Sequence, residues 1–205
     1  MNSEVTFQAE SHTYAVDGKR IPSVTQIIEP LQDFSKVDPI TLRAAQEFGN
    51  EVHAMTALWD QGTLDEEDLD IGLIPYLQGW RKFLKQTECE VYEVELAVHH
   101  EKYGYAGRLD RVAYLKRGRR RICAILDIKT GEAKNPVTGV QLAGYHAAYT
   151  SSRKVEPPYS IYRIGVRLLA SGEYRLDWWE SKSDWPTFLA LLQITNWRIK
   201  NGMNK

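Results

Sequence analysis

Apolar and polar positions follow two different periods along this chain, and together they predict both helices and strands. Strand-like segments at about 90–99, 105–115 and 121–130 are separated by short turns that contain Gly104 and Gly118. Connections this short join antiparallel neighbours in a sheet. We therefore expect three consecutive strands in the middle of the fold.

The segments before and after these strands show apolar residues at a helical period. Phe48, Val52, Met55 and Trp59 recur at intervals of four, three and four residues, which places them on one face of a helix. That helix is expected to begin after an N-cap at Asp38 and to end near residue 60. The other expected elements are helices at about 74–86, 137–150 and from 183 onwards, and strands at about 5–8, 12–16, 160–169 and 173–179.

The first 36 residues are expected to form a compact arm. Asp17-Gly18 is a strong hairpin signal, and Ser23 precedes a short helical segment that Pro30 is expected to stop. No repeat or domain boundary interrupts the pattern. The sequence predicts a single domain over 1–205, with an arm at 1–36 and a core at 37–205, in the α/β class: a central mixed sheet flanked by helices.

Composition narrows the class of protein. Of 205 residues, 43% are hydrophobic and 26% are charged, which is typical of a folded domain. Two cysteines, Cys89 and Cys123, cannot form a disulfide framework or a four-thiolate iron–sulfur cluster. The first residues resemble no signal peptide, and no apolar stretch approaches the roughly 20 residues of a membrane span. We expect a cytoplasmic protein with no membrane association.

The charged residues indicate a candidate binding surface only locally. The net charge of −1 gives no general attraction to nucleic acid, so any such binding has to come from a patch. The basic run at 116–121 is one such patch. Two interpretations stay open for it: a solvated hairpin tip, or a surface that contacts phosphates.

The most informative triplet is Asp127-Ile128-Lys129, which ends a buried-strand pattern. Side chains two residues apart in a strand share a face, so the carboxylate and the amine project together while Ile128 enters the core. A short hairpin would also bring Asp110, on the preceding strand, within about 5 Å of Asp127. Two carboxylates this close repel unless a cation lies between them, and hard oxygen ligands suit Mg²⁺ or Mn²⁺. The alternative is a pair of unrelated strand-end aspartates.

Lys129 would place an ammonium group beside such a metal. Lys129 is suited to hold a nucleophilic water and to stabilise charge that develops on a phosphate. Gly107 precedes Asp110 by three residues and removes a side chain where a backbone could approach closely.

The ordered set Gly107-x-x-Asp110, Asp127-Ile-Lys129 and Gln141-x-x-x-Tyr145 resembles the PD-(D/E)XK nuclease superfamily, in its RecB-type and lambda-exonuclease-like branch. The resemblance covers about residues 5–180 and implies a restriction-endonuclease-like core. It implies that His53, in Gly49-x-x-x-His53, is a further metal ligand together with Asp110, Asp127 and the Ile128 carbonyl. It implies a supporting role for Gln141 and Tyr145, although their spacing alone is also that of simple helix packing. Glu95 is either an outer-shell partner of the metal or a solvated residue.

The resemblance implies a Mg²⁺- or Mn²⁺-dependent deoxyribonuclease that acts on linear DNA ends, leaves 5′-phosphate products and serves phage or bacterial recombination or repair. A single-strand annealing protein or a recombinase would be its protein partner. DNA contacts are expected from five basic residues: Arg108, Lys116, Arg117, Arg119 and Arg120. Tyr103 and Tyr105 are expected to stack on unpaired bases.

Two other functions remain open. A structure-selective or single-strand endonuclease would use the same catalytic residues, Asp110, Asp127 and Lys129. A non-catalytic DNA-binding recombination module would have the fold without the metal.

Overall fold

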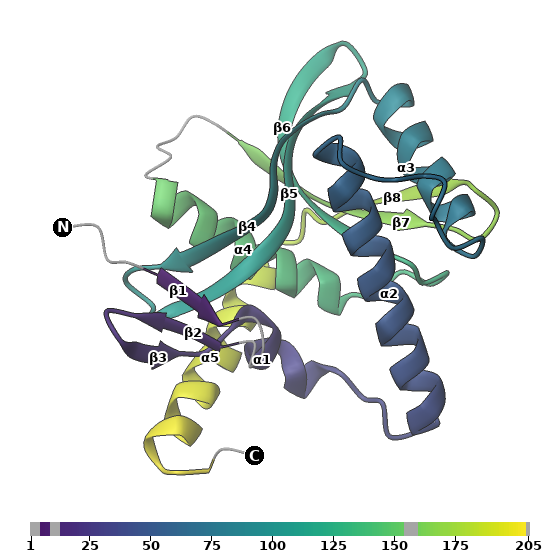
Figure 1. Ribbon diagram of the computed structural model, residues 1–205. Coiled ribbons are helices and arrows are strands. Elements are labelled where there is room, and N and C mark those ends of the chain that lie inside the picture. The colour runs from purple at the N-terminus through teal and green to yellow at the C-terminus, as the bar shows by residue number, and fades with distance from the viewer. Residues whose placement is uncertain (1–4, 9–12, 154–159, 204–205) are drawn as a thin grey trace.

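The computed structural model describes residues 5–8, 13–153 and 160–203 (Figure 1). Its centre is a five-stranded sheet in the order β4-β5-β6-β7-β8. The strands are β4 (Glu90–His100), β5 (Tyr105–Arg117), β6 (Arg120–Lys129), β7 (Ile161–Leu168) and β8 (Tyr174–Trp178). β6 and β7 pair in parallel and the other neighbours pair antiparallel. The predicted mixed sheet is confirmed.

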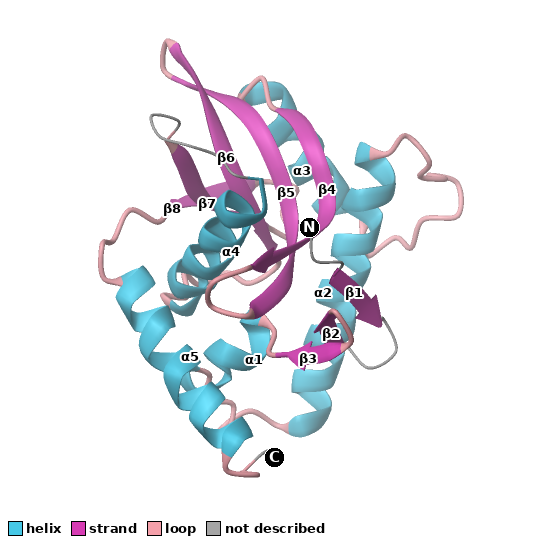
Figure 2. Ribbon diagram, turned by 90° about the vertical axis from the view of Figure 1, so that its left-hand side faces the viewer, coloured by secondary structure: helices cyan, strands magenta, loops and turns pink. Residues whose placement is uncertain are grey.

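Helices cover both faces of this sheet. The helices are α1 (Val24–Ile28), α2 (Pro39–Asp60), α3 (Ile74–Gln86), α4 (Val137–Arg153) and α5 (Asp184–Lys200). α2 and α3 pack on one face, and α1, α4 and α5 pack on the other (Figure 2). The α/β class with a sheet flanked by helices is therefore confirmed.

Each face of the sheet has its own apolar core. Leu126 and Ile128 of β6 contribute to the core under α2 and α3, while Ile125 contributes to the core under α4 and α5. This is the alternation that the strand pattern predicted, with Asp127 and Lys129 turned away from Ile128. The polar pair therefore sits on a strand that is anchored by apolar side chains on its other face.

Local signals account for the helix boundaries. Asp38 caps α2 by accepting a hydrogen bond from Thr41 N at 2.9 Å, and Pro39 occupies the first helical position. Ser23 caps α1 in a reciprocal capping box with Gln26. The α-helical segment ends at Ile28, just before Pro30 as predicted, and Pro30 lies in the 3₁₀ turn that follows, η1 (Glu29–Leu31). Proline is tolerated there because the first turn of a helix does not use its N–H.

The arm forms a small sheet of its own, β1 (Val5–Gln8), β2 (Thr13–Val16) and β3 (Lys19–Ile21). Asp17 and Gly18 form the predicted turn, with φ of 50° and 76°. His12, expected at the start of the second strand, lies outside the described residues. The arm is joined to the central sheet where Ala106 N donates to Pro22 O at 3.1 Å. This junction brings the arm beside the start of β5, close to Asp110.

No helix within the described ranges has the length and apolar character needed to cross a bilayer.

Candidate metal centre

The candidate site lies where β5 and β6 part. The two strands pair from Arg117↔Arg120 down to Arg111↔Leu126, and the ladder stops there. Beyond that pair the two strands no longer pair with each other: β5 continues alongside β4, and β6 continues alongside β7. Asp110 and Asp127 are the next residues on the two strands, so both carboxylates come to the fork.

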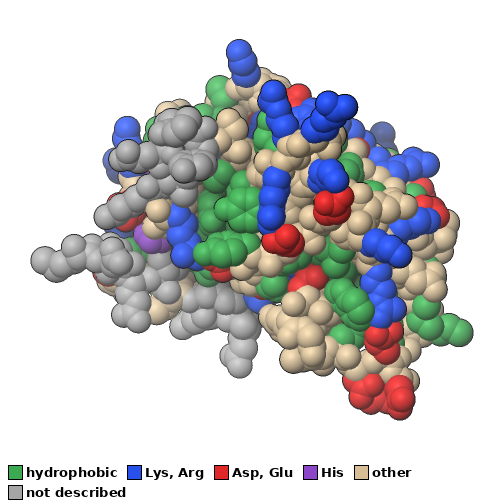
Figure 3. Space-filling model, turned by 90° about the horizontal axis from the view of Figure 1, so that it is seen from above, with side chains coloured by type: hydrophobic (Ala, Val, Ile, Leu, Met, Phe, Trp, Pro, Cys, Tyr) green, Lys and Arg blue, Asp and Glu red, His purple; other side chains and the backbone are tan. Residues whose placement is uncertain are grey.

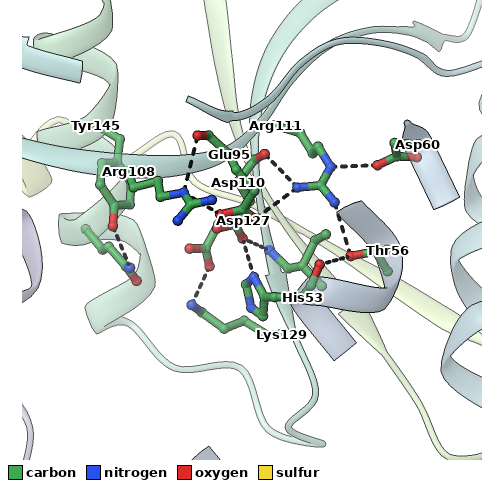
Figure 4. A network of polar contacts seen from close by, with 12 residues as sticks. His53, Thr56, Asp60, Glu95, Arg108, Asp110, Arg111, Asp127, Lys129 and Tyr145 are labelled. Atoms are coloured by element: carbon green, nitrogen blue, oxygen red, sulfur yellow. Dashed lines mark hydrogen bonds and ion pairs between the residues drawn. The ribbon is translucent and has the colours of Figure 1, made fainter. Parts of the chain in front are cut away.

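The Asp110 carboxylate spans this fork. Its Oδ2 accepts a hydrogen bond from Ile128 N at 2.7 Å and lies 3.4 Å from Nδ1 of His53 (Figure 4). His53 reaches the site from α2, one helical turn after Gly49. The structure therefore brings these two predicted ligands together, and their role as metal ligands stays a prediction.

Asp127 and Lys129 share the same fork. Asp127 Oδ2 lies 2.8 Å from Lys129 Nζ, with the Asp127 side chain 3% exposed and the Lys129 side chain 36% exposed. The carboxylate is therefore enclosed, whereas the Lys129 side chain borders solvent. Their shared orientation is the one that strand alternation predicted.

Three ligand atoms approach one another closely enough to hold a cation. One atom each from His53, Glu95 and Asp110 lies within 4.8 Å of the other two. Two carboxylates and an imidazole make a donor set that suits a divalent cation such as Mn²⁺ or Mg²⁺. Glu95, which the sequence left between an outer-shell and a solvated role, thus belongs to the group of candidate ligands. Asp127 is not within this mutual distance, and its role as a ligand, like that of the Ile128 carbonyl, stays a prediction.

The electrostatics of the two aspartates differ. Burial alone would raise the pKa of Asp110, but His53, Lys129 and the Ile128 N–H lower it to about 2. Burial raises the pKa of Asp127, and the neighbouring Asp110 charge raises it further against the opposing effect of Lys129. The pKa values of the two neighbouring carboxylates therefore shift in opposite directions. A cation between them would favour the ionised form of both, so the pair is suited to bind one.

Acidic neighbours raise the pKa of both basic groups of the site. Burial would lower the pKa of Lys129, but the charges of Asp127 and Asp110 raise it above its ordinary value. Burial would likewise lower the pKa of His53, but Asp110 raises it. Lys129 is thus protonated at neutral pH, and its ammonium is a hydrogen-bond donor there.

Glu95 occupies its place at the cost of backbone strain. Its φ is 50°, in the left-handed region that a side chain rarely adopts, inside a β-strand. Such a conformation costs on the order of 1–3 kcal/mol and persists only where neighbours enforce it. Here the carboxylate is held by Arg108 at 3.0 Å and Arg111 at 3.1 Å. Regular alternation along β4 would place Glu93 and Glu95 on one face of the sheet, but Glu93 pairs with Arg153 of α4.

Gly107 makes room for a side chain of the site. A Cβ atom at this position would lie 2.6 Å from Cε1 of Tyr145 and 3.0 Å from Cγ2 of Val24. The expectation that a backbone approaches here is wrong, since an aromatic ring fills the space. Tyr145 is buried, and its hydroxyl is 3.5 Å from Nε2 of Gln141, as their shared helical face predicted.

The basic residues predicted to contact DNA lie in two places. Arg108 lies beside the site, paired with Glu95. Arg117 and Arg120 flank the tip of the β5–β6 hairpin, so the basic run lies at a hairpin tip. Whether that tip is only solvated or also contacts phosphates stays a prediction. Arg117 is seven residues beyond Asp110, roughly 23 Å at the rise of a strand.

Figure 3 looks down on this end of the molecule and shows basic side chains gathered there with acidic ones among them. Lys116 pairs with Glu88, and Arg117 pairs with Glu180 while lying 4.1 Å from the Trp178 ring centre. Arg119 and Arg120 are exposed and have no acidic partner among the described residues. Tyr105 is fully buried and its hydroxyl donates to Gly144 O, so the expectation that it stacks on bases is wrong.

Sequence reasoning missed a buried charge network next to the site. Arg111 has a side chain with 0% exposure and contacts Asp60 and Thr56 of α2. The available signal was an arginine inside the apolar stretch of β5, which required a buried acidic partner. Its spacing gave no indication of where that partner lay.

Comparison with known proteins adds little to this geometry. No family model matches the chain, and no curated protein matches its sequence. Among solved structures, an alkaline exonuclease from Laribacter hongkongensis aligns over 88% of this chain and 92% of its own, with 12% identity and a TM-score of 0.39. That likeness is too low to assign a family, so the geometry of the site has to carry the functional conclusion.

Proposed function

We propose that this chain is a Mg²⁺- or Mn²⁺-dependent deoxyribonuclease that hydrolyses phosphodiester bonds at the ends of linear DNA. The observation that carries the proposal is the fork between β5 and β6. It gathers Asp110, Asp127 and Lys129 from two strands and receives His53 from α2. The order and type of these residues match the PD-(D/E)XK pattern described above.

The residues present fit a divalent cation. His53, Glu95 and Asp110 offer three donors at mutual reach, and Asp127 adds a carboxylate at the same fork. A bound Mg²⁺ or Mn²⁺ ion would supply Lewis-acid chemistry to a phosphate and its attacking water. The protein groups are already oriented for it, because the Ile128 N–H holds Asp110 and the Lys129 ammonium holds Asp127.

Lys129 contributes a positive charge in addition to that of the metal, and it also contributes hydrogen-bond donors. Its protonated amine borders solvent and donates hydrogen bonds, so it can orient a water and stabilise negative charge on a phosphate oxygen. Tyr145 and Gln141 line the α4 side of the fork and steady its inner wall. Arg108 pairs with Glu95 beside the site. When Glu95 binds a cation, the Arg108 guanidinium is in a position to contact a DNA phosphate.

The decisive experiment is cleavage of end-labelled linear duplex DNA with Mn²⁺. Asp127→Ala and Lys129→Ala are expected to lose at least about 100-fold in rate, in line with removing a single transition-state contact. Matched controls are Asp68→Ala and Lys182→Ala, which remove the same kinds of charge from exposed positions. Wild-type-like cleavage by either site variant, with the fold intact by circular dichroism, would overturn the proposal.

Covalently closed circular DNA separates the two nuclease modes. An exonuclease leaves this substrate intact and degrades it after linearisation, whereas an endonuclease nicks the closed circle. Labels placed separately at the 5′ and 3′ ends then report polarity.

A further inference from the structure

Arg111 is the most deeply buried charged residue of the site region. Its guanidinium has 0% exposure, although it follows Asp110 directly on β5. A buried charge is stabilised by hydrogen bonds from its donors, and this guanidinium makes four of them, to partners on three elements. Figure 4 shows its guanidinium pointing towards Asp60 and Thr56 on one side and Glu95 on the other.

The contacts of Arg111 are directional. Nε donates to Asp60 Oδ2 at 2.6 Å, and Nη2 donates to Thr56 Oγ1 at 3.2 Å, so both bonds reach α2. Nη1 donates to Glu95 Oε1 at 3.1 Å on β4 and to Asp110 O at 2.7 Å on β5 itself. A planar guanidinium can make all four bonds at once because its donors point in fixed, diverging directions.

These bonds lead to all three candidate metal ligands. Glu95 is contacted directly, and the Asp110 main chain is contacted through its carbonyl. His53 is reached through one intermediate, since the Thr56 hydroxyl donates to His53 O at 3.0 Å. The three ligands come from three separate elements, and Arg111 is the group that links all three.

The far end of the network is anchored in the core. Asp60 ends α2, and its Oδ1 accepts a hydrogen bond from the indole Nε1 of Trp80 at 2.9 Å. Trp80 is fully buried and belongs to α3. Arg111 is therefore fixed against a rigid part of the fold, as a positioning residue has to be.

We propose that Arg111 is a positioning residue that sets the separation of His53, Glu95 and Asp110 for binding a divalent cation. It also holds Glu95 in its left-handed backbone conformation, because the carboxylate is tied to Arg111 and Arg108. This inference rests on the metal-dependent function proposed above. It predicts that metal affinity depends on the shape of the group at position 111 and not on its charge alone.

Arg111→Lys tests shape at constant charge. A lysine ammonium is a point charge on a flexible stem and cannot satisfy Asp60, Thr56 and Glu95 together. We expect Mn²⁺ binding, measured by calorimetry with MnCl₂ alone and no DNA, to weaken by about 10- to 100-fold, as for removal of an outer-shell partner. Thr56→Val tests the arm to His53 separately, because it removes the hydroxyl and keeps the side-chain shape; a smaller decrease in the same direction is expected.

Arg163→Lys is the matched control. Arg163 is also a mostly buried arginine, with a side chain 14% exposed, and it contacts Asp184, Gly139 O and Ser181 O, none of which is a candidate ligand. This variant is expected to lose stability in urea unfolding while its Mn²⁺ affinity stays at the wild-type value. Calorimetry is run at a temperature at which every variant is folded by circular dichroism.

The outcomes are distinct. Wild-type Mn²⁺ affinity in folded Arg111→Lys overturns the inference, and so does an equal decrease of affinity in Arg163→Lys. If Arg111→Lys does not fold, the folded Thr56→Val variant decides, and unchanged affinity there overturns the inference. A wild-type protein that binds no Mn²⁺ overturns the metal centre itself, and with it the proposed function. Weak binding by the Arg111 and Thr56 variants beside a normal control supports the inference.

Discussion

The carboxylate of Asp110 accepts a hydrogen bond from the backbone N–H of Ile128 at 2.7 Å. The bond joins β5 to β6 just beyond the last pair of their ladder, where a backbone carbonyl would otherwise serve. A candidate metal ligand thus also closes the fork that contains it. The position of Asp110 is coupled to that of Asp127 and Lys129 on either side of Ile128.

Replacing Asp110 should therefore affect both binding and stability. Asp110→Ala leaves the buried Ile128 N–H without its acceptor, which costs roughly 1–3 kcal/mol of the free energy of unfolding. Asp110→Asn keeps an acceptor and should recover part of that stability in urea unfolding. Both variants should lose Mn²⁺ binding in calorimetry. Unchanged affinity in folded Asp110→Asn would exclude Asp110 as a ligand.

Gly107 should tolerate no side chain. In Gly107→Ala the new Cβ meets the Tyr145 ring at 2.6 Å, and overpacking of this kind costs about 1–3 kcal/mol. The cost should shrink in a Tyr145→Ala background, so a double-mutant cycle on urea unfolding should show coupling between the two positions. Gly131→Ala is the matched control, because nothing lies within 4 Å of its Cβ. Simple additivity of the two substitutions would rule out this close approach as the reason for the glycine.

The affinity for Mn²⁺ should fall as the pH falls. The Asp110 carboxylate outweighs burial and raises the pKa of His53 above 6.5, so protons compete with a metal for this imidazole from neutral pH downwards. We expect affinity to decrease by up to about tenfold per pH unit once His53 is protonated. Calorimetry between pH 8 and pH 6 measures the slope. His53→Ala should bind more weakly with a flatter profile, and an unchanged slope would place His53 outside the ligand set.

A different histidine should destabilise the fold in acid. Burial, and then the charge of Arg163, lower the pKa of His146 in the folded state. The unfolded chain takes up a proton near pH 6.5 before the folded chain does, so this stabilisation is present above pH 6.5 and is lost as the pH falls towards the folded-state pKa. Urea unfolding at pH 7.5 and 5.5 should show a smaller decrease in stability for His146→Gln than for the wild type. An equal decrease in both would assign the acid sensitivity to other groups.

DNA binding should be sensitive to salt and to the hairpin tip. Arg119 and Arg120 are the exposed basic residues of the tip with no acidic partner among the described residues. Arg119→Gln/Arg120→Gln should weaken binding to duplex DNA and lower the slope of log affinity against log salt by about 0.9 for each phosphate that the variant no longer neutralises. Fluorescence anisotropy with a calcium buffer, which is not expected to support cleavage, measures both. Arg81→Gln, an arginine of α3 paired with Glu66, is the control. An unchanged slope in the double variant would indicate that the hairpin tip is solvated and does not contact DNA phosphates.

Much of the architecture follows from local patterns. The 4-3-4 spacing in α2, the caps at Asp38 and Ser23, and the turns at Gly104 and Gly118 each depend on residues that are close in sequence. The short turns alone made β4, β5 and β6 antiparallel neighbours. The pairing of Asp127 with Lys129, and the meeting of Asp110 with the following strand, came from the same local rules.

Other features required the tertiary structure, because they depend on residues that are far apart in the chain. Glu95 joins the ligand group through a backbone φ of 50°, which strand alternation does not predict, and through two arginines that hold it there. The reason for Gly107 is a ring on α4, contributed by Tyr145. The sequence by itself determined the candidate catalytic residues and the strands on which they lie. Only the packing of α2 and β4 against β5 decided which of these residues come within reach of one cation. The physical reason is that the buried guanidinium of Arg111 is stabilised by hydrogen-bond acceptors on α2 and β4, which fixes those elements around β5.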